Sequence, residues 1–98
     1  MSYYGNILTL VQATPVQQQQ VATVLTAHNC VYQQVDQTFY LETRSIAHTQ
    51  QVAREVEGLG VPFAFFHNRV SKGSFCYPVG LPDDVREKIH QILFVDPA

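Results

Sequence analysis

The pattern of apolar and polar positions predicts an antiparallel hairpin in the segment 29–45. Two short stretches there alternate with a period of two, which is typical of strands buried on one face. The apolar positions, which we expect to face the helices, are Val31, Val35, Phe39 and Leu41. The positions expected on the opposite face are Tyr32, Gln34, Tyr40 and Glu42. Asp36 and Gln37 fill the two-residue connection, although such turns prefer Asn-Gly or Asp-Gly.

A strand and a helix are predicted before this hairpin. The nearly continuous apolar run at 7–13 is typical of a central strand covered on both faces. Thr14 and Gln17 have the spacing of a capping box, and Pro15 lies at the first helical position, so a helix begins there. Asn29 ends this helix, since Asn tolerates the left-handed conformation at a helix end.

Four more elements are predicted after the hairpin. Ser45 caps a second helix, which ends at Gly58 and Gly60. The apolar segments 61–66 and 75–79 indicate two strands, and Pro78 places the second at a sheet edge because proline donates no ladder hydrogen bond. A third helix begins with acidic residues and carries an apolar stripe. The members of this stripe are Val85, Ile89, Ile92 and Leu93.

The predicted order is β-α-β-β-α-β-β-α, and its first six elements match the split βαβ order of a ferredoxin-like sandwich. We therefore expect one α+β domain over residues 1–98, with a largely antiparallel sheet and an added C-terminal strand and helix. The strands at 7–13 and 38–43 would lie in its middle, with helices on one face. The added elements would extend one edge or cover the second face. Another α+β sandwich with the same element order is the alternative.

Charge is scarce in this chain, and that shortage favours assembly. Charged residues make up 14% of the sequence and hydrophobic residues 46%, whereas about 25% charge is usual. A homo-oligomer that hides part of its surface fits this composition, and a glutamine-rich monomer is the alternative. The net charge of −2 and six Lys and Arg residues argue against nucleic-acid binding. The strand 38–44 also lacks the glycine and basic start of an RNA-recognition motif.

The compartment expected from the sequence is the cytoplasm. No run approaches the roughly 18 apolar residues of a membrane span, and the first residues do not resemble a signal peptide. Cys30 and Cys76 lack CxxC spacing, so we expect two structural thiols in a reducing compartment. The small, glutamine-rich, lysine-poor chain further suggests a bacterial accessory protein of a mobile element or phage.

The candidate binding residues lie on the sheet face away from the first two helices and in the following loop. An aromatic sheet face is too apolar to remain exposed to solvent, so it marks an interaction surface or lies beneath the C-terminal helix. Loop residues at strand ends are favoured binding positions. The candidates for a ligand or an interface are Tyr32, Tyr40, Glu42, His67, Arg69 and Tyr77.

No catalytic, metal or cofactor motif is present. The four histidines lack H-x-x-x-H and HExxH spacing, and no glycine-rich loop opens a helix. A pair of Cys76 and His67 across the second hairpin has no third member to orient it. We therefore expect a non-enzymatic homo-oligomeric module that binds itself, a protein partner or a small apolar ligand. The alternative is a ligand-binding or enzymatic ferredoxin-like domain with its pocket between the sheet face and the C-terminal helix.

Overall fold

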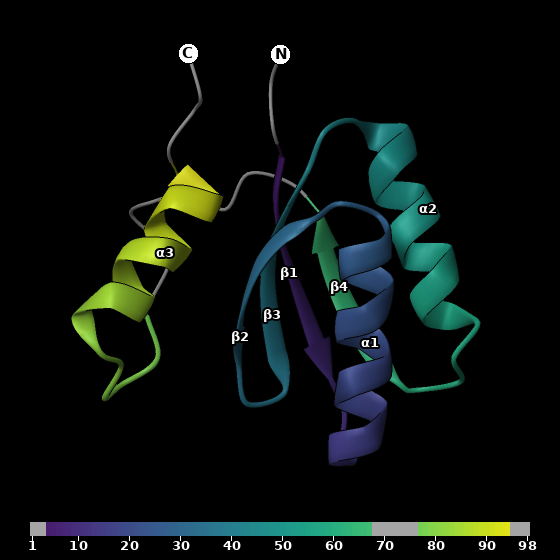
Figure 1. Cartoon of the computed structure of the whole chain (residues 1–98), viewed down its shortest axis with the longest axis horizontal. Coiled ribbons are helices and arrows are strands. Elements are labelled where there is room, and N and C mark those ends of the chain that lie inside the picture. Colours follow the sequence, from purple (N-terminus) through teal and green to yellow (C-terminus); the bar gives the residue numbers. More distant parts are fainter. Residues whose placement is uncertain (1–3, 68–76, 95–98) are drawn as a thin grey trace.

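The computed structural model describes residues 4–67 and 77–94, which form four strands and three helices (Figure 1). The elements in chain order are β1 (Tyr4–Leu10), α1 (Pro15–Ala27), β2 (Val31–Val35), β3 (Thr38–Thr43), α2 (Ile46–Glu57), β4 (Phe63–His67) and α3 (Asp83–Phe94).

The strands form one antiparallel sheet in the order β2-β3-β1-β4, with β1 and β3 in the middle. Figure 1 shows three layers: α1 and α2 pack on one face of the sheet, and α3 lies on the other. The fold is therefore α+β. Because α3 contacts β1, β2 and β3, it covers the second face only on the β2 side of the sheet.

Two hydrophobic cores lie on opposite faces of the sheet. The larger joins α1 and α2 to the strands, and Phe39 and Leu8 are its largest fully buried side chains. The smaller lies under α3, where Tyr40, Ile89 and Ile92 are buried. The predicted stripe of the third helix is thus confirmed for Ile89 and Ile92, and it covers the second sheet face rather than extending an edge.

The predicted facing of the first hairpin strand is wrong. Val35 pairs with Thr38 across the two-residue turn, and residues directly opposite in a sheet share a face. Val35 therefore lies with Tyr40 under α3, whereas Tyr32, opposite Leu41, packs on the α1–α2 side. The prediction holds for β3, whose Phe39 and Leu41 face α1 and α2.

The first strand lies three residues earlier than the predicted 7–13. Gln12 has a φ of 52°, which ends the extended backbone beyond Leu10. Beyond this point the backbone of Ala13 hydrogen-bonds to the Gln37 side chain, as it would to a neighbouring strand. Gln37 Oε1 accepts from the Ala13 N–H at 2.9 Å, and Gln37 Nε2 donates to the Ala13 carbonyl at 3.0 Å. The turn residue therefore fastens the chain as it enters α1.

The predicted strand at 75–79 lies partly outside the described residues. Within the described part, Tyr77 and Pro78 have no strand conformation and Val79 lies in a turn. The fourth strand begins at Phe63, two residues later than the predicted 61–66. Among the described strands, the sheet edges are β2 and β4.

The capping box of α1 is confirmed, and it gives a first prediction. Thr14 Oγ1 accepts from the Gln17 N–H at 3.2 Å, and Gln17 Oε1 accepts from the Thr14 N–H at 2.9 Å. We expect Thr14→Ala to lower the free energy of unfolding by about 1 kcal/mol, because it leaves a helix-terminal N–H without its acceptor. Urea denaturation measures the loss. Thr14→Ser keeps the hydroxyl and should retain most of the stability; equal losses in both variants would contradict the capping role.

Candidate functional site

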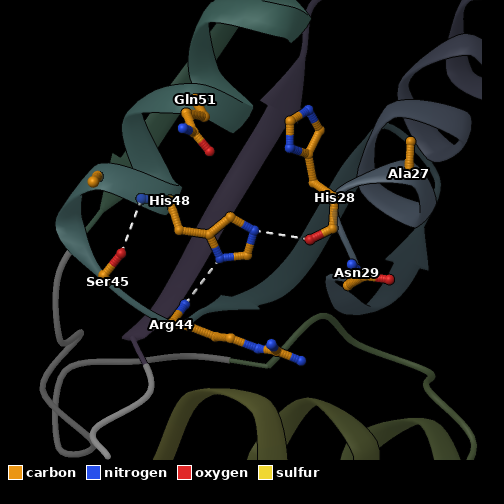
Figure 2. Close-up of a pocket in the computed structure, with 8 residues that line it drawn as sticks. Ala27, His28, Asn29, Arg44, Ser45, His48 and Gln51 are labelled. Carbon is orange, nitrogen blue, oxygen red and sulfur yellow. Dashed lines mark hydrogen bonds between the residues drawn. The ribbon is translucent and has the colours of Figure 1, made fainter.

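A groove of about 470 Å³ separates the end of α1 from the beginning of α2 (Figure 2). We call it the α1–α2 groove. Its lining carries one arginine and two histidines and no acidic side chain. The lining residues are Ala27, His28, Asn29, Arg44, Ser45, Ala47, His48 and Gln51. The lining therefore carries the positive charge of Arg44 and mixes polar with apolar side chains.

His48 is the central side chain of this groove, and both of its ring nitrogens are engaged. Nδ1 accepts from the Arg44 N–H at 3.1 Å, and Nε2 lies 2.8 Å from the His28 carbonyl oxygen (Figure 2). A carbonyl oxygen only accepts, so Nε2 carries the hydrogen and donates it to His28. Ser45 caps α2 by accepting from the His48 N–H at 3.0 Å. His48 therefore ties the two helix ends together and has no free nitrogen for a substrate.

Cys30 lies beside His48 without forming an activated thiol. Its Sγ is 4.0 Å from His48 Nε2 and 4.0 Å from the His28 carbonyl oxygen. Burial raises the pKa of the Cys30 thiol from 9.0 to about 11, against a smaller opposing effect of the Arg44 charge. Since the Nε2 hydrogen of His48 is directed at His28, the histidine does not accept the thiol proton. This arrangement gives no nucleophile at neutral pH.

The raised pKa predicts that Cys30 reacts slowly with thiol reagents. At pH 8 a shift from 9.0 to about 11 reduces the thiolate fraction about a hundredfold. We expect Cys76→Ser, which leaves Cys30 as the only cysteine, to be labelled by a disulfide reagent at least about a hundredfold more slowly when folded than in urea. The folded rate should still be rising above pH 9. A folded rate equal to that in urea would contradict the burial of Cys30.

A second candidate surface lies along β4, where α3 leaves the sheet uncovered. The register Ile7↔Phe66 and Thr9↔Ala64 places Ala64 and Phe66 on the α3 side of the sheet. Both are exposed, and the Phe66 side chain is 60% accessible. We call these two side chains, together with the outer edge of β4, the β4 strip. β4 contains no Lys, Arg, Asp or Glu.

The six residues predicted as a site do not form a single cluster. Tyr40 and Tyr77 share the core under α3, and Tyr77 Oη lies 3.2 Å from His90 Nδ1. Glu42 lies on the same sheet face, where burial raises its pKa against the opposing effects of Lys88 and Arg44. The others are separate: Tyr32 packs on the α1–α2 side, His67 ends β4, and Arg69 lies outside the described residues.

The sequence predicts an aromatic sheet face, of which the β4 strip is the exposed part, but it gives no indication of the α1–α2 groove. His48 stands three residues after the N-cap Ser45, a position from which a side chain can reach the preceding loop. That spacing was the available signal, but its partner, the His28 carbonyl, lies 20 residues away along the chain. The alternation within 61–66 left open whether Phe63 and Phe65 or Ala64 and Phe66 lie on that face, and the β1–β4 register assigns Ala64 and Phe66 to it.

Comparison with protein-family models, curated proteins and solved structures gives no match for this chain. Among the described residues, no group of three His, Cys, Asp or Glu side chains is placed to hold a metal ion. None of the three described helices is both long and apolar enough to cross a membrane.

Proposed function

We propose that this chain is a small non-enzymatic interaction module that assembles with a second copy of itself. The observation that carries the proposal is the β4 strip, where Phe66 is 60% exposed on a strand at the sheet edge. Isolated exposed apolar residues are common on monomers, but an uncovered apolar strand edge favours pairing with another chain. The scarcity of charge supports the same conclusion, since a chain with 14% charged residues has little to keep such a strip solvated.

The proposed fold class is ferredoxin-like. β1 and β2 are each antiparallel to β3, which lies between them, so β1 and β2 run parallel with one strand inserted. This arrangement supports a split βαβ unit. In such a fold α3 is an addition that covers part of the second face.

The site chemistry supports a binding role over catalysis. Both ring nitrogens of His48 hydrogen-bond to backbone groups, and burial raises the pKa of the neighbouring Cys30 thiol. A free, buried thiol also suits a reducing compartment, so we place the module in the cytoplasm. An accessory role in a bacterium, mobile element or phage remains part of the proposal.

The decisive experiment measures the molar mass in solution and the effect of a charge on the β4 strip. We expect a dimer by light scattering at micromolar concentration, and Phe66→Lys should convert it to a monomer. Ile46→Lys is the matched control, because Ile46 is 64% exposed at the beginning of α2, which packs on the opposite face of the sheet from Phe66. A native monomer, or equal dissociation by both variants, would contradict the proposal.

A second candidate function is the binding of a small anion in the α1–α2 groove. The observation in its favour is a lining that holds Arg44 and His28 and no acidic side chain. Titration with inorganic phosphate, followed by the NMR shifts of the His28 and His48 rings, tests this function. Saturable shifts that disappear in Arg44→Gln would support it, and unchanged spectra would exclude phosphate as a ligand.

A further inference from the structure

The hydrogen-bonding direction of each β4 residue follows from the register. Val11 N–H donates to the Pro62 carbonyl at 2.9 Å, and these two residues continue the β1–β4 pairing by one position. In an antiparallel pair, hydrogen-bonded and non-hydrogen-bonded positions alternate. Ala64 and Phe66 therefore bond to β1. Phe63, Phe65 and His67 direct their backbone N–H and carbonyl groups away from β1, toward the outer edge.

The other side of β1 gives an independent check. Leu10 N–H donates to the Gln37 carbonyl at 2.8 Å, in register with the β1–β3 pairing. Leu10 and Leu8 therefore bond to β3, so their partners Phe63 and Phe65 receive no backbone bond from β1. Both sheet interfaces thus assign the same outward-facing positions on β4.

From this edge we infer that two copies of the chain pair antiparallel through β4, with Phe65 opposite Phe65 of the second copy. The inference rests on the proposed function and specifies its interface. The three outward-facing residues are spaced symmetrically about Phe65, so a two-fold axis there satisfies all of them. Phe63 then exchanges hydrogen bonds with His67 of the second copy, and the two four-stranded sheets become one continuous sheet. A two-fold axis is the commonest symmetry of protein dimers.

Side-chain sizes fit this register on the uncovered face. Ala64 of one copy would lie opposite Phe66 of the other, in a non-hydrogen-bonded pair where side chains approach most closely. Each exposed phenyl ring would thus pack over a methyl group, twice about the axis. A shift of two residues in one direction would oppose Phe66 with Phe66, and a shift in the other would oppose Phe66 with Pro62. Only the register centred on Phe65 pairs all five β4 residues.

The sequence of β4 carries none of the charged or proline residues that protect sheet edges. This sequence, Phe-Ala-Phe-Phe-His, contains no proline, lysine or carboxylate, and Pro62 precedes the outward-facing positions. Edge strands in monomers are usually blunted by charge, proline or a bulge. Pro78, which cannot donate a ladder hydrogen bond, lies outside β4 and so does not block pairing at this edge.

Cysteine cross-linking tests the register. In a Cys30→Ser, Cys76→Ser background, Phe65→Cys would lie about 5.5 Å, Cα to Cα, from its symmetry mate, within the range of a disulfide. Phe63→Cys is the matched control: it removes the same side chain on the same face, but its symmetry mate lies four residues along the strand, about 14 Å away. We expect rapid oxidation to a covalent dimer for Phe65→Cys and at least tenfold slower oxidation for Phe63→Cys.

A size exchange provides a second measurement that does not depend on cysteine. Phe66→Ala should weaken dimerisation about tenfold, because two aromatic pairs are lost. The double variant Ala64→Phe, Phe66→Ala moves each ring to the opposite strand of the same pair, so it should restore the affinity to within about threefold.

The outcomes separate this inference from the proposed function. A native dimer that cross-links equally at 63 and 65 would overturn the β4 register but not self-association. The same conclusion would follow if the double variant Ala64→Phe, Phe66→Ala did not regain the affinity that Phe66→Ala loses. A native monomer would overturn both. A monomer with a slowly exchanging Phe65 amide would further show that another part of the same chain occupies the edge.

Discussion

Gly5→Ala is expected to loosen α3 from the sheet and to lower the free energy of unfolding by about 1–3 kcal/mol. A Cβ atom at Gly5 would lie 2.9 Å from the Leu93 Cα and 3.1 Å from the Ile92 carbonyl oxygen. Both are backbone atoms of α3, so no side-chain rotation relieves the overlap. The helix must move outward, and Ile92 and Tyr40 then lose part of their packing.

Two measurements distinguish this displacement from a general loss of stability. Urea denaturation gives the free energy, and spectroscopic titration follows Tyr40, whose pKa is raised by burial. In Gly5→Ala the Tyr40 pKa should fall toward its ordinary value. Gly58→Ala is the control, because Gly58 has a φ of −62° and a Cβ there would lie 3.4 Å from the Glu55 carbonyl oxygen, an ordinary contact distance. Unchanged stability and an unchanged Tyr40 pKa in Gly5→Ala would contradict the close approach.

Local rules predicted the parts of the fold that depend on neighbours in the chain. The capping box at Thr14, the left-handed Asn29 with a φ of 60°, and the turn at Asp36 and Gln37 all lie as expected. Each depends on backbone groups within a few residues. Such features are fixed by backbone sterics and local hydrogen bonds, which the sequence displays directly.

The prediction of which sheet face each β2 residue occupies was wrong for a physical reason. A two-residue turn places Val35 opposite Thr38. Odd-numbered residues of β2 therefore share a sheet face with even-numbered residues of β3. Alternation alone assigned both valines of β2 to the face of Phe39. In the structure that face receives Tyr32 instead, whose ring lies 5.7 Å from the Phe39 ring, centroid to centroid. Period-two patterns identify strands, but the turn determines which face each residue joins.

The candidate surfaces depend on contacts between distant segments. The predicted aromatic face exists, yet α3 covers its Tyr40 half and leaves the Phe66 half open. The position of α3 depends on the absence of a side chain at Gly5, nearly 90 residues earlier in the chain. No local pattern signals that relation. On the described part of this face, Tyr40 is therefore buried and Phe66 is exposed.

Thr43→Val is expected to lower the free energy of unfolding by about 1–3 kcal/mol, because it breaks a buried chain of hydrogen bonds. Thr49 Oγ1 donates to the Ser45 carbonyl at 2.9 Å, so its hydrogen is not available to Thr43. The Thr43 hydroxyl must therefore donate to Thr49 Oγ1 at 2.6 Å, and it accepts from Asn6 Nδ2 at 2.9 Å. The chain thus runs in one direction from β1 through β3 to the first turn of α2.

Valine matches the shape of threonine but can neither accept from Asn6 nor donate to Thr49. Asn6 and Thr43 are fully buried, so water does not replace the lost partners. Thr38→Val is the matched control on the same strand: its hydroxyl lies 3.3 Å from that of Thr9 in a half-buried pair, where water can substitute. We expect the control to change stability by less than about 0.5 kcal/mol in urea denaturation. Equal effects of the two substitutions would show that the buried chain of hydrogen bonds adds nothing beyond ordinary threonine packing, so that apolar packing, including that of Val52 and Val56, holds α2 to the sheet.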